Sequence, residues 1–145
     1  MEPLDRQILS LLVGDGRMSY TDIGKETGLS TSAAQQRVRR LEQRGVITGY
    51  RAVIDPTQLG LMLTAFVSVT PFQPDQPDDA PEVLKGLPQV VSCYSVAGEA
   101  NYLLKVQVAT TNELEKVLGS IRSTSRVSTH SIIVLSTFYE DRPLV

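Results

Sequence analysis

The sequence has 145 residues, enough for one domain of ordinary size or for two small ones. With 41% hydrophobic and 21% charged residues and no apolar run near the roughly 18 to 20 residues of a membrane span, it excludes an integral membrane protein and a broadly disordered one. The net charge of −2 argues weakly against a nucleic-acid partner, but residues 1–51 carry eight basic and six acidic side chains, so positive charge collects towards the N-terminus.

The chain begins with a pattern that predicts an amphipathic helix. Apolar residues recur at i, i+4, i+7 and i+8, and glycines follow at the expected helix end, residues 14 and 16. This apolar stripe consists of Leu4, Ile8, Leu11 and Leu12. We expect it to be a core face.

Nothing at the N-terminus resembles a signal peptide, since Glu2, Asp5 and Arg6 interrupt its apolar positions. The single cysteine, Cys93, cannot form an internal disulfide, which suits a reducing compartment. We therefore expect a cytoplasmic protein, in which Cys93 is a small buried hydrophobe of a strand-like run.

A second, short helix is predicted after Ser19, whose hydroxyl can cap it while Asp22 reaches back as the capping-box partner. Gly28 marks its end. Gly24 lies inside it, where a glycine costs about 1 kcal/mol relative to alanine. We therefore expect Gly24 to allow the close approach of a neighbouring helix.

The third helix is predicted from Ser30, as N-cap, to a stop at Gly45. Its inward stripe consists of Ala34, Val38 and Leu41. The run at 46–56 is rich in β-branched residues and alternates, which predicts a strand or short β-ribbon leading into a linker. Asp55 and Pro56 close this run, so we place a domain boundary near residues 55–60.

After residue 60 the periodicity changes to that of alternating strands and helices. The predicted elements are a strand at 61–70, a short helix near 82–85, strands at 90–96 and 102–108, a helix capped by Thr110 and Glu113, and a last strand at 127–140. The order is β-α-β-β-α-β, the ferredoxin-like arrangement, so the fold class is α+β.

The predicted strands are apolar on both faces. In the last strand, Ile132 and Val134 point to one side, with Ile133 and Leu135 on the other. Helices can cover only one face of such a sheet. A second copy packed on the open face would bury the other, and we therefore expect at least a homodimer.

The stretch from Ser19 to Arg44 has the plan of a helix-turn-helix, with a tight turn at residues 28–29 and a polar, basic outer face on the second helix. In this motif the second helix enters the major groove of double-stranded DNA, and flanking cations meet phosphates. Glutamine can pair with adenine and arginine with guanine or phosphate. The candidate DNA-binding residues are Ser30, Thr31, Ser32, Gln35, Gln36, Arg37, Arg39 and Arg40.

Two alternatives stay open at this helix. The outer face of a charged amphipathic helix can simply be solvated, although the capped helix and glycine turn before it favour DNA binding. Arg37 lies beside the inward stripe, so it can form an ion pair with a carboxylate of the first helix as readily as it can contact DNA.

These motifs resemble the Lrp/AsnC family, the feast/famine regulators of bacteria and archaea. The resemblance spans nearly the whole chain and rests on LDRQIL at 4–9, DGRMSYTDIG at 15–24, the run from TGLSTS to TQLG at 27–60, and the hairpin around GEANYLL. It implies a winged helix-turn-helix at 1–50, a β-strand linker at 51–60 and an effector-binding and oligomerisation domain at 61–145. It further implies dimers, which in the family often assemble into octamers.

In this family an amino acid or related small molecule binds near a Gly-Asp-x-Asp turn. The resemblance places that effector site at Gly98, Glu99, Ala100 and Asn101. Asn101 stands where the second aspartate would be, which removes a charge that could meet an α-ammonium group. Thr129 and Ser131 are candidate hydroxyl partners by position. The alternative is that these four residues form a simple hairpin turn.

Two rival functions remain. Some proteins that resemble this family are decarboxylases of haem biosynthesis, but the only histidine, His130, has no second histidine or cysteine at ligand spacing. We therefore expect no metal, no cofactor and no enzymatic activity. An architectural protein that compacts DNA is the other rival, and the two adjacent glutamines of the third helix favour base reading over it.

Overall fold

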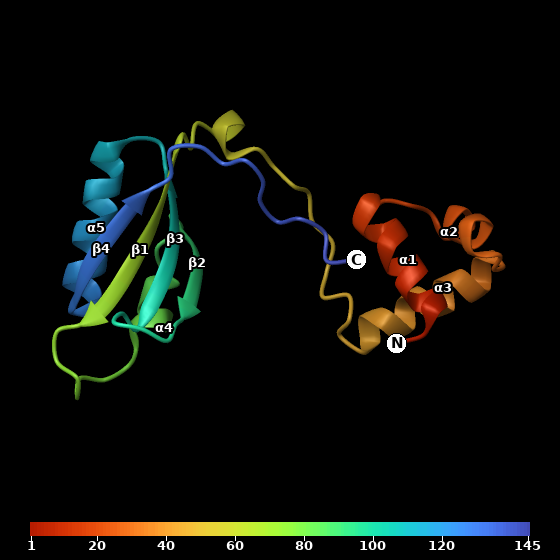
Figure 1. Cartoon of the computed structure of the whole chain (residues 1–145), viewed down its shortest axis with the longest axis horizontal. Coiled ribbons are helices and arrows are strands. Elements are labelled where there is room, and N and C mark those ends of the chain that lie inside the picture. Colours follow the sequence, from red (N-terminus) through yellow and green to blue (C-terminus); the bar gives the residue numbers. More distant parts are fainter. The chain divides into compact units, whose positions relative to one another are not determined.

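The computed structural model describes all 145 residues and divides them into two compact units. One unit comprises residues 1–53 and the C-terminal residues 139–145, and the other comprises residues 54–138 (Figure 1). None of the helices combines the length and apolar character needed to cross a membrane.

The first unit contains three helices, α1 (Pro3–Gly14), α2 (Tyr20–Thr27) and α3 (Thr31–Gln43). Their serine caps are as predicted: Ser19 Oγ accepts a hydrogen bond from the Asp22 N–H at 3.0 Å, and Ser30 Oγ accepts one from the Ala33 N–H at 3.1 Å. These caps fix where α2 and α3 begin, and therefore which side chains of each helix face the core.

The helices enclose a small core between them. Its buried side chains come from all three helices and include the predicted stripe of α3; they are Ile8, Leu9, Ile23, Ala34, Val38 and Leu41. Because the inward stripe of α3 is confirmed, the opposite face of that helix is the one presented to solvent.

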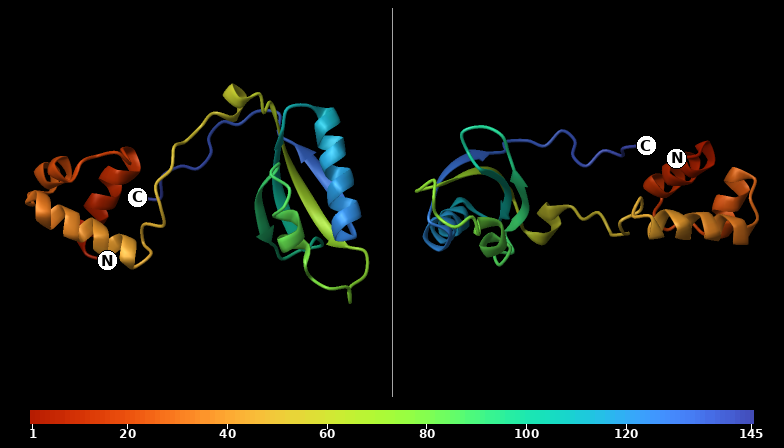
Figure 2. Two further views of the ribbon diagram at one scale, coloured as in Figure 1. Left: turned by 180° about the vertical axis from the view of Figure 1, so that it is seen from behind. Right: turned by 90° about the horizontal axis from the view of Figure 1, so that it is seen from below.

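The second unit is a four-stranded antiparallel sheet in the order β2-β3-β1-β4. Its strands are β1 (Leu63–Pro71), β2 (Val90–Ser95), β3 (Tyr102–Val108) and β4 (Val127–Ile133), and its helices are α4 (Ala80–Leu84) and α5 (Thr111–Ser125). Both helices cover the same face of the sheet, as Figure 2 shows. The predicted β-α-β-β-α-β order is confirmed.

The strand register separates the two faces of this sheet. The covered face carries the buried residues of the central strands, among them Val67, Val69 and Leu104, which pack with Ile121 of α5. The open face carries apolar side chains from all four strands: Phe66 and Leu103 are half-buried, and Tyr94 and Ile132 are exposed. Apolar side chains thus occur on both faces, as predicted, but Ser68, Lys105 and His130 also lie on the open face.

The predicted strand at residues 51–60 is wrong for the single chain. Residues 51–55 are irregular, and Pro56–Leu59 form the 3-10 helix η1, capped by Asp55. A strand needs a hydrogen-bonded neighbour, and no other segment of the chain pairs with this one. The β-ribbon that would make the helix-turn-helix winged is absent for the same reason.

Two further predictions need correction. The last strand ends at Ile133, not near residue 140: its pairing with β1 stops at Ala65 and Ile133, and only one more backbone hydrogen bond follows, from the Val134 N–H to the Thr64 carbonyl oxygen at 2.9 Å. Cys93 is exposed, not buried. It lies on β2, an edge strand that has a neighbour on only one side, so the strand-like pattern around Cys93 does not place it in the core.

Candidate DNA-binding and effector sites

The turn between α2 and α3 is made by backbone that packs tightly against α2. Gly28 ends α2 in the left-handed region at φ 72°, where glycine is strongly preferred. The Leu29 N–H then donates to the Gly24 carbonyl oxygen at 2.9 Å. This hydrogen bond holds the turn that leads into α3 against the end of α2.

Most of the predicted DNA-binding residues lie together on the outer side of α3. Six of them are exposed and two are half-buried. The exposed ones are Ser30, Thr31, Ser32, Gln36, Arg39 and Arg40, and the half-buried ones are Gln35 and Arg37. Thr31 is also held near α2, because its hydroxyl lies 3.2 Å from that of Thr21.

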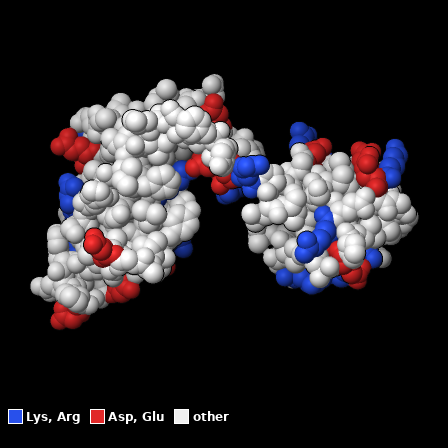
Figure 3. Space-filling model, viewed as in Figure 1, with Lys and Arg blue, Asp and Glu red and all other residues white.

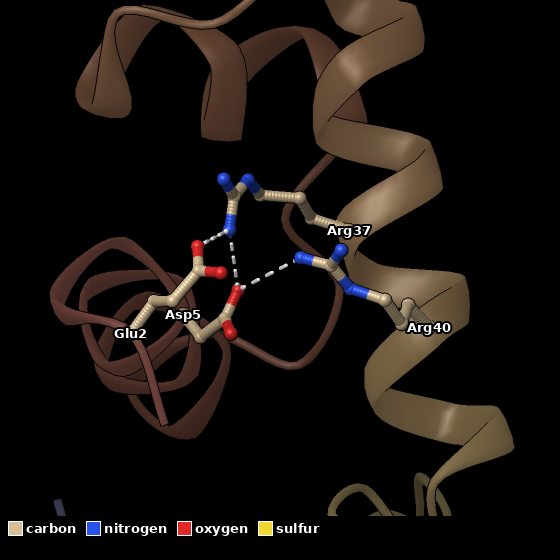
Figure 4. Close-up of polar contacts among 4 residues, drawn as sticks. All are labelled: Glu2, Asp5, Arg37 and Arg40. Carbon is tan, nitrogen blue, oxygen red and sulfur yellow. Dashed lines mark hydrogen bonds and ion pairs between the residues drawn. The ribbon is translucent and has the colours of Figure 1, made fainter.

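Arg37 forms ion pairs across the unit (Figure 4). Its Nη1 lies 2.7 Å from Glu2 Oε2 and 2.9 Å from Asp5 Oδ1. These two hydrogen bonds raise the pKa of Arg37, and the bond from Arg37 lowers the pKa of Glu2. Arg40 Nη2 lies 3.8 Å from the same Asp5 oxygen. Arg37 therefore forms the ion pair with a carboxylate of the first helix that its position beside the inward stripe allows.

The charge of α3 is distributed unevenly around the helix. Arg37 and Arg40 face carboxylates of α1, whereas Arg39 and Arg44 form no ion pair with any residue. Figure 3 shows basic side chains at several separate places on the first unit, with acidic side chains close to them. The cations free to meet a polyanion are therefore fewer than the sequence suggests.

Another polar contact closes the far end of α3. The Tyr50 hydroxyl donates to Glu42 Oε1 at 2.9 Å. Burial, with a contribution from Glu42, raises the pKa of Tyr50 to about 12. This contact ties the segment after α3 back onto the helix, and no local pattern predicts it because it joins a helix residue to one in the irregular segment that follows.

The predicted effector turn connects β2 to β3 and is mostly exposed. Gly98 has φ 151°, which favours glycine, and no atom lies within 4 Å of where its β-carbon would stand. The Asn101 N–H donates to the Val69 carbonyl oxygen of β1 at 3.0 Å, which holds the end of the turn against the sheet. The Glu99 side chain is exposed to solvent.

Thr129 and Ser131 lie on β4, which is separated from β3 by β1. They pair with Val69 and Val67, whose side chains face the helices, so both hydroxyls belong to the covered face. Thr129 Oγ1 also accepts a hydrogen bond from Arg122 Nη1 of α5 at 3.2 Å. Within one chain the structure does not bring these hydroxyls together with the turn.

A partly buried polar contact lies near the same end of the sheet. The Tyr102 hydroxyl donates to Asp78 Oδ1 of the loop after β1. This hydrogen bond, followed by burial, raises the pKa of Tyr102 to about 12. His130 is exposed on the open face, and no group of three or more histidine, cysteine or acidic side chains is placed to hold a metal ion.

Known proteins match both units of this chain. The family model described as the AsnC-type helix-turn-helix domain matches residues 1–42, and that of the Lrp/AsnC ligand binding domain matches residues 64–144. The chain belongs to the Lrp/AsnC family. It is a DNA-binding transcriptional regulator, as the sequence predicted.

Relatives within the Lrp/AsnC family cover the full length of the chain. The HTH-type transcriptional regulator LrpA of Mycobacterium tuberculosis is 50% identical over 142 residues, which are 98% of this chain and 95% of that protein. The crystal structure of the leucine response regulatory protein LrpA from the same organism has a TM-score of 0.89 at 49% identity, covering 99% of this chain and 98% of that one.

A second solved structure of the Lrp/AsnC family carries a small molecule. It is a feast or famine regulatory protein from M. tuberculosis complexed with L-methionine, with a TM-score of 0.95 at 50% identity, covering 98% of this chain and 97% of that one. These likenesses confirm the fold class. The roles of individual residues in this Lrp/AsnC regulator stay predictions.

Proposed function

We propose that this regulator reads a specific duplex through α3 and that an amino acid alters its binding or its assembly. The first part rests on helices α2 and α3. Each begins at a serine N-cap, a glycine turn joins them, and α3 presents a polar outer face to solvent. The second part rests on the match of residues 64–144 to a ligand binding domain.

The residues of α3 divide by the chemistry that each can perform on DNA. Ser30, Thr31 and Ser32 lie at the helix N-terminus, where backbone N–H groups and hydroxyls suit a phosphate. Gln35 and Gln36 can read adenine, and Gln36 is the more exposed of the two. Arg39 can meet either guanine or phosphate because no carboxylate holds it.

The amino-acid effector is assigned to the turn at residues 98–101. Support comes from the solved relative that is complexed with L-methionine. The exposed Glu99 carboxylate can accept hydrogen bonds from an α-ammonium group, and charge-assisted bonds of this kind are among the stronger ones. Because Thr129 and Ser131 lie on the covered face, a hydroxyl contribution from them requires a second chain or a rearrangement.

We further propose a homodimer through the open face of the sheet, from which octamers can be built. Phe66, Tyr94, Leu103 and Ile132 form an apolar patch there, and Tyr94 and Ile132 are 53% and 59% exposed in the single chain. Such a patch is more typical of an interface than of a free surface. No site of the chain suggests an enzymatic role.

A titration on DNA tests the proposal. The purified chain is added to the DNA upstream of its own gene, at fixed salt, with random duplex as competitor and with or without an amino-acid mixture. Binding that survives the competitor supports a sequence-specific regulator. Equal binding to all duplexes favours the architectural rival, and an absence of binding to any duplex contradicts the proposal.

A further inference from the structure

Asp5 holds an unusual position for a carboxylate in a DNA-binding unit. It is the third residue of α1, and its side chain is only 1% exposed although it carries a charge. The helix N-terminus partly offsets that burial, because an acidic side chain there is favoured by the helix dipole. The rest of the compensation comes from two arginines of α3 (Figure 4).

The two arginines occupy one edge of α3. They are three residues apart, and side chains at that spacing lie one above the other on a helix. Arg37 Nη1 is 2.9 Å and Arg40 Nη2 is 3.8 Å from a single oxygen of Asp5. Arg39, in contrast, projects from the outer face and forms no ion pair.

Breaking the ion pairs with Asp5 costs more than breaking the ion pair between Arg37 and Glu2, because the Asp5 side chain is buried and the Glu2 side chain is exposed. If both guanidiniums swing from Asp5 to DNA phosphates, they leave a buried, uncompensated carboxylate, and breaking buried ion pairs in this way is strongly destabilising. Glu2 differs, because its side chain is 60% exposed and water can replace Arg37. The restraint on Arg37 and Arg40 is therefore set by Asp5.

We propose that Asp5 is a positioning residue that withholds Arg37 and Arg40 from DNA phosphates and thereby raises the ratio of specific to non-specific binding. This inference rests on the proposed binding of DNA by α3. Non-specific binding is driven by the number of phosphates that cations neutralise, whereas base contacts carry the specificity. With two arginines of α3 withheld, Gln36 and Arg39 keep their contacts while the sequence-independent attraction is reduced.

The variant Asp5→Asn tests this, because asparagine keeps the shape of the side chain and removes its charge. The readout is the slope of log affinity against log salt for a random duplex. Each phosphate contact contributes about 0.9 to that slope. We expect the slope to steepen by about 0.9 for each arginine released and the specific to non-specific ratio to fall. The matched control, Glu2→Gln, should leave both unchanged.

A purely structural role for Asp5 predicts a different result. In that case Asp5→Asn weakens binding to specific and random duplexes alike, with an unchanged slope, and this outcome overturns the inference. The proposed function stands if the unmodified chain still binds its specific duplex. If the unmodified chain binds no duplex, the proposed function fails first, and this inference fails with it.

A second variant keeps the test decisive if Asp5→Asn unfolds the first unit. Arg37→Gln leaves Asp5 with Arg40 as its partner and removes only one guanidinium. Since Arg37 is withheld from phosphates, we expect the salt slope to be unchanged in this variant. A slope shallower by about 0.9 shows that Arg37 contacts a phosphate, and it overturns the inference.

Discussion

A β-carbon added to Gly24 would lie 2.5 Å from the carbonyl oxygen of Leu29, closer than such atoms ever approach. The neighbour is backbone, so it cannot rotate away as a flexible side chain would. The close approach predicted for Gly24 is thus real, but it is to the turn that enters α3 rather than to the side of another helix.

Gly24→Ala should therefore destabilise the first unit although alanine is the better helix former. Overpacking of this kind costs about 1 to 3 kcal/mol, against a gain of about 1 kcal/mol in helix propensity. We expect a lower denaturation midpoint and weaker DNA binding, because the turn that orients α3 is displaced. Chemical denaturation followed by helical circular dichroism measures the first effect.

Gly119→Ala is the matched control for that substitution. Gly119 lies inside α5, and no atom stands within 4 Å of its added β-carbon. The same change there should stabilise the second unit by about 0.8 kcal/mol. If both substitutions stabilise the chain, a clash between the added β-carbon and the turn does not explain why position 24 is a glycine.

Gln36 and Arg39, two exposed polar side chains on α3, should respond differently to truncation. Arg39→Ala should weaken binding to specific and random duplexes alike and make the salt slope shallower by about 0.9, as loss of one phosphate contact does. Gln36→Ala should leave the slope unchanged and reduce discrimination at one base pair, by about 1 to 3 kcal/mol. Competition titrations with a set of single-base operator variants compare the two, and identical effects would contradict these roles.

The local signals in the sequence predicted most of the fold. Serine caps at 19 and 30, glycine stops and the periodicity of apolar residues define α2, α3 and the strand order, because each depends on residues close together in the chain. The pattern around Cys93 misled, since alternation shows that a residue belongs to a strand and not whether that strand is at the edge of the sheet.

The site was less accessible to sequence reasoning. The ion pairs of Arg37 with Asp5 and Glu2 join positions more than 30 residues apart, so they depend on how α1 crosses α3. The sequence could suggest a carboxylate of the first helix as partner, but it could not select Asp5 or show that this carboxylate is buried. The face on which Thr129 points was equally hidden, because register alone decides it.

The effector turn makes a prediction about ligand charge. Asn101→Asp restores a second carboxylate beside Glu99, so the affinity for an α-ammonium group should rise, by about tenfold if one charge-assisted hydrogen bond of about 1.5 kcal/mol is gained. The thermal shift produced by L-methionine measures this. Glu99→Gln should reduce the shift. The α-keto acid analogue, which lacks the ammonium group, should gain nothing from the aspartate; an equal gain would place the ligand's ammonium group elsewhere.

The raised pKa of the Tyr102 hydroxyl makes the stability of the second unit depend on pH in the alkaline range. Its pKa is raised from 10.0 to about 12 in the folded chain, chiefly by the hydrogen bond to Asp78. The folded state therefore holds this proton more tightly than the unfolded state does. The resulting stability is fully present below pH 10 and is lost as the pH rises through about 12.

Tyr102→Phe should flatten this dependence, so that the free energy of unfolding of the second unit falls less between about pH 10 and about pH 12. Denaturation midpoints of both proteins across that range measure the difference. Asp78 is exposed, so water can solvate its carboxylate once the phenol is gone. Tyr50→Phe is the control, because the pKa of Tyr50 is also about 12 but its hydroxyl lies in the first unit. A pH dependence of the second unit that survives Tyr102→Phe would assign the alkaline loss to other groups.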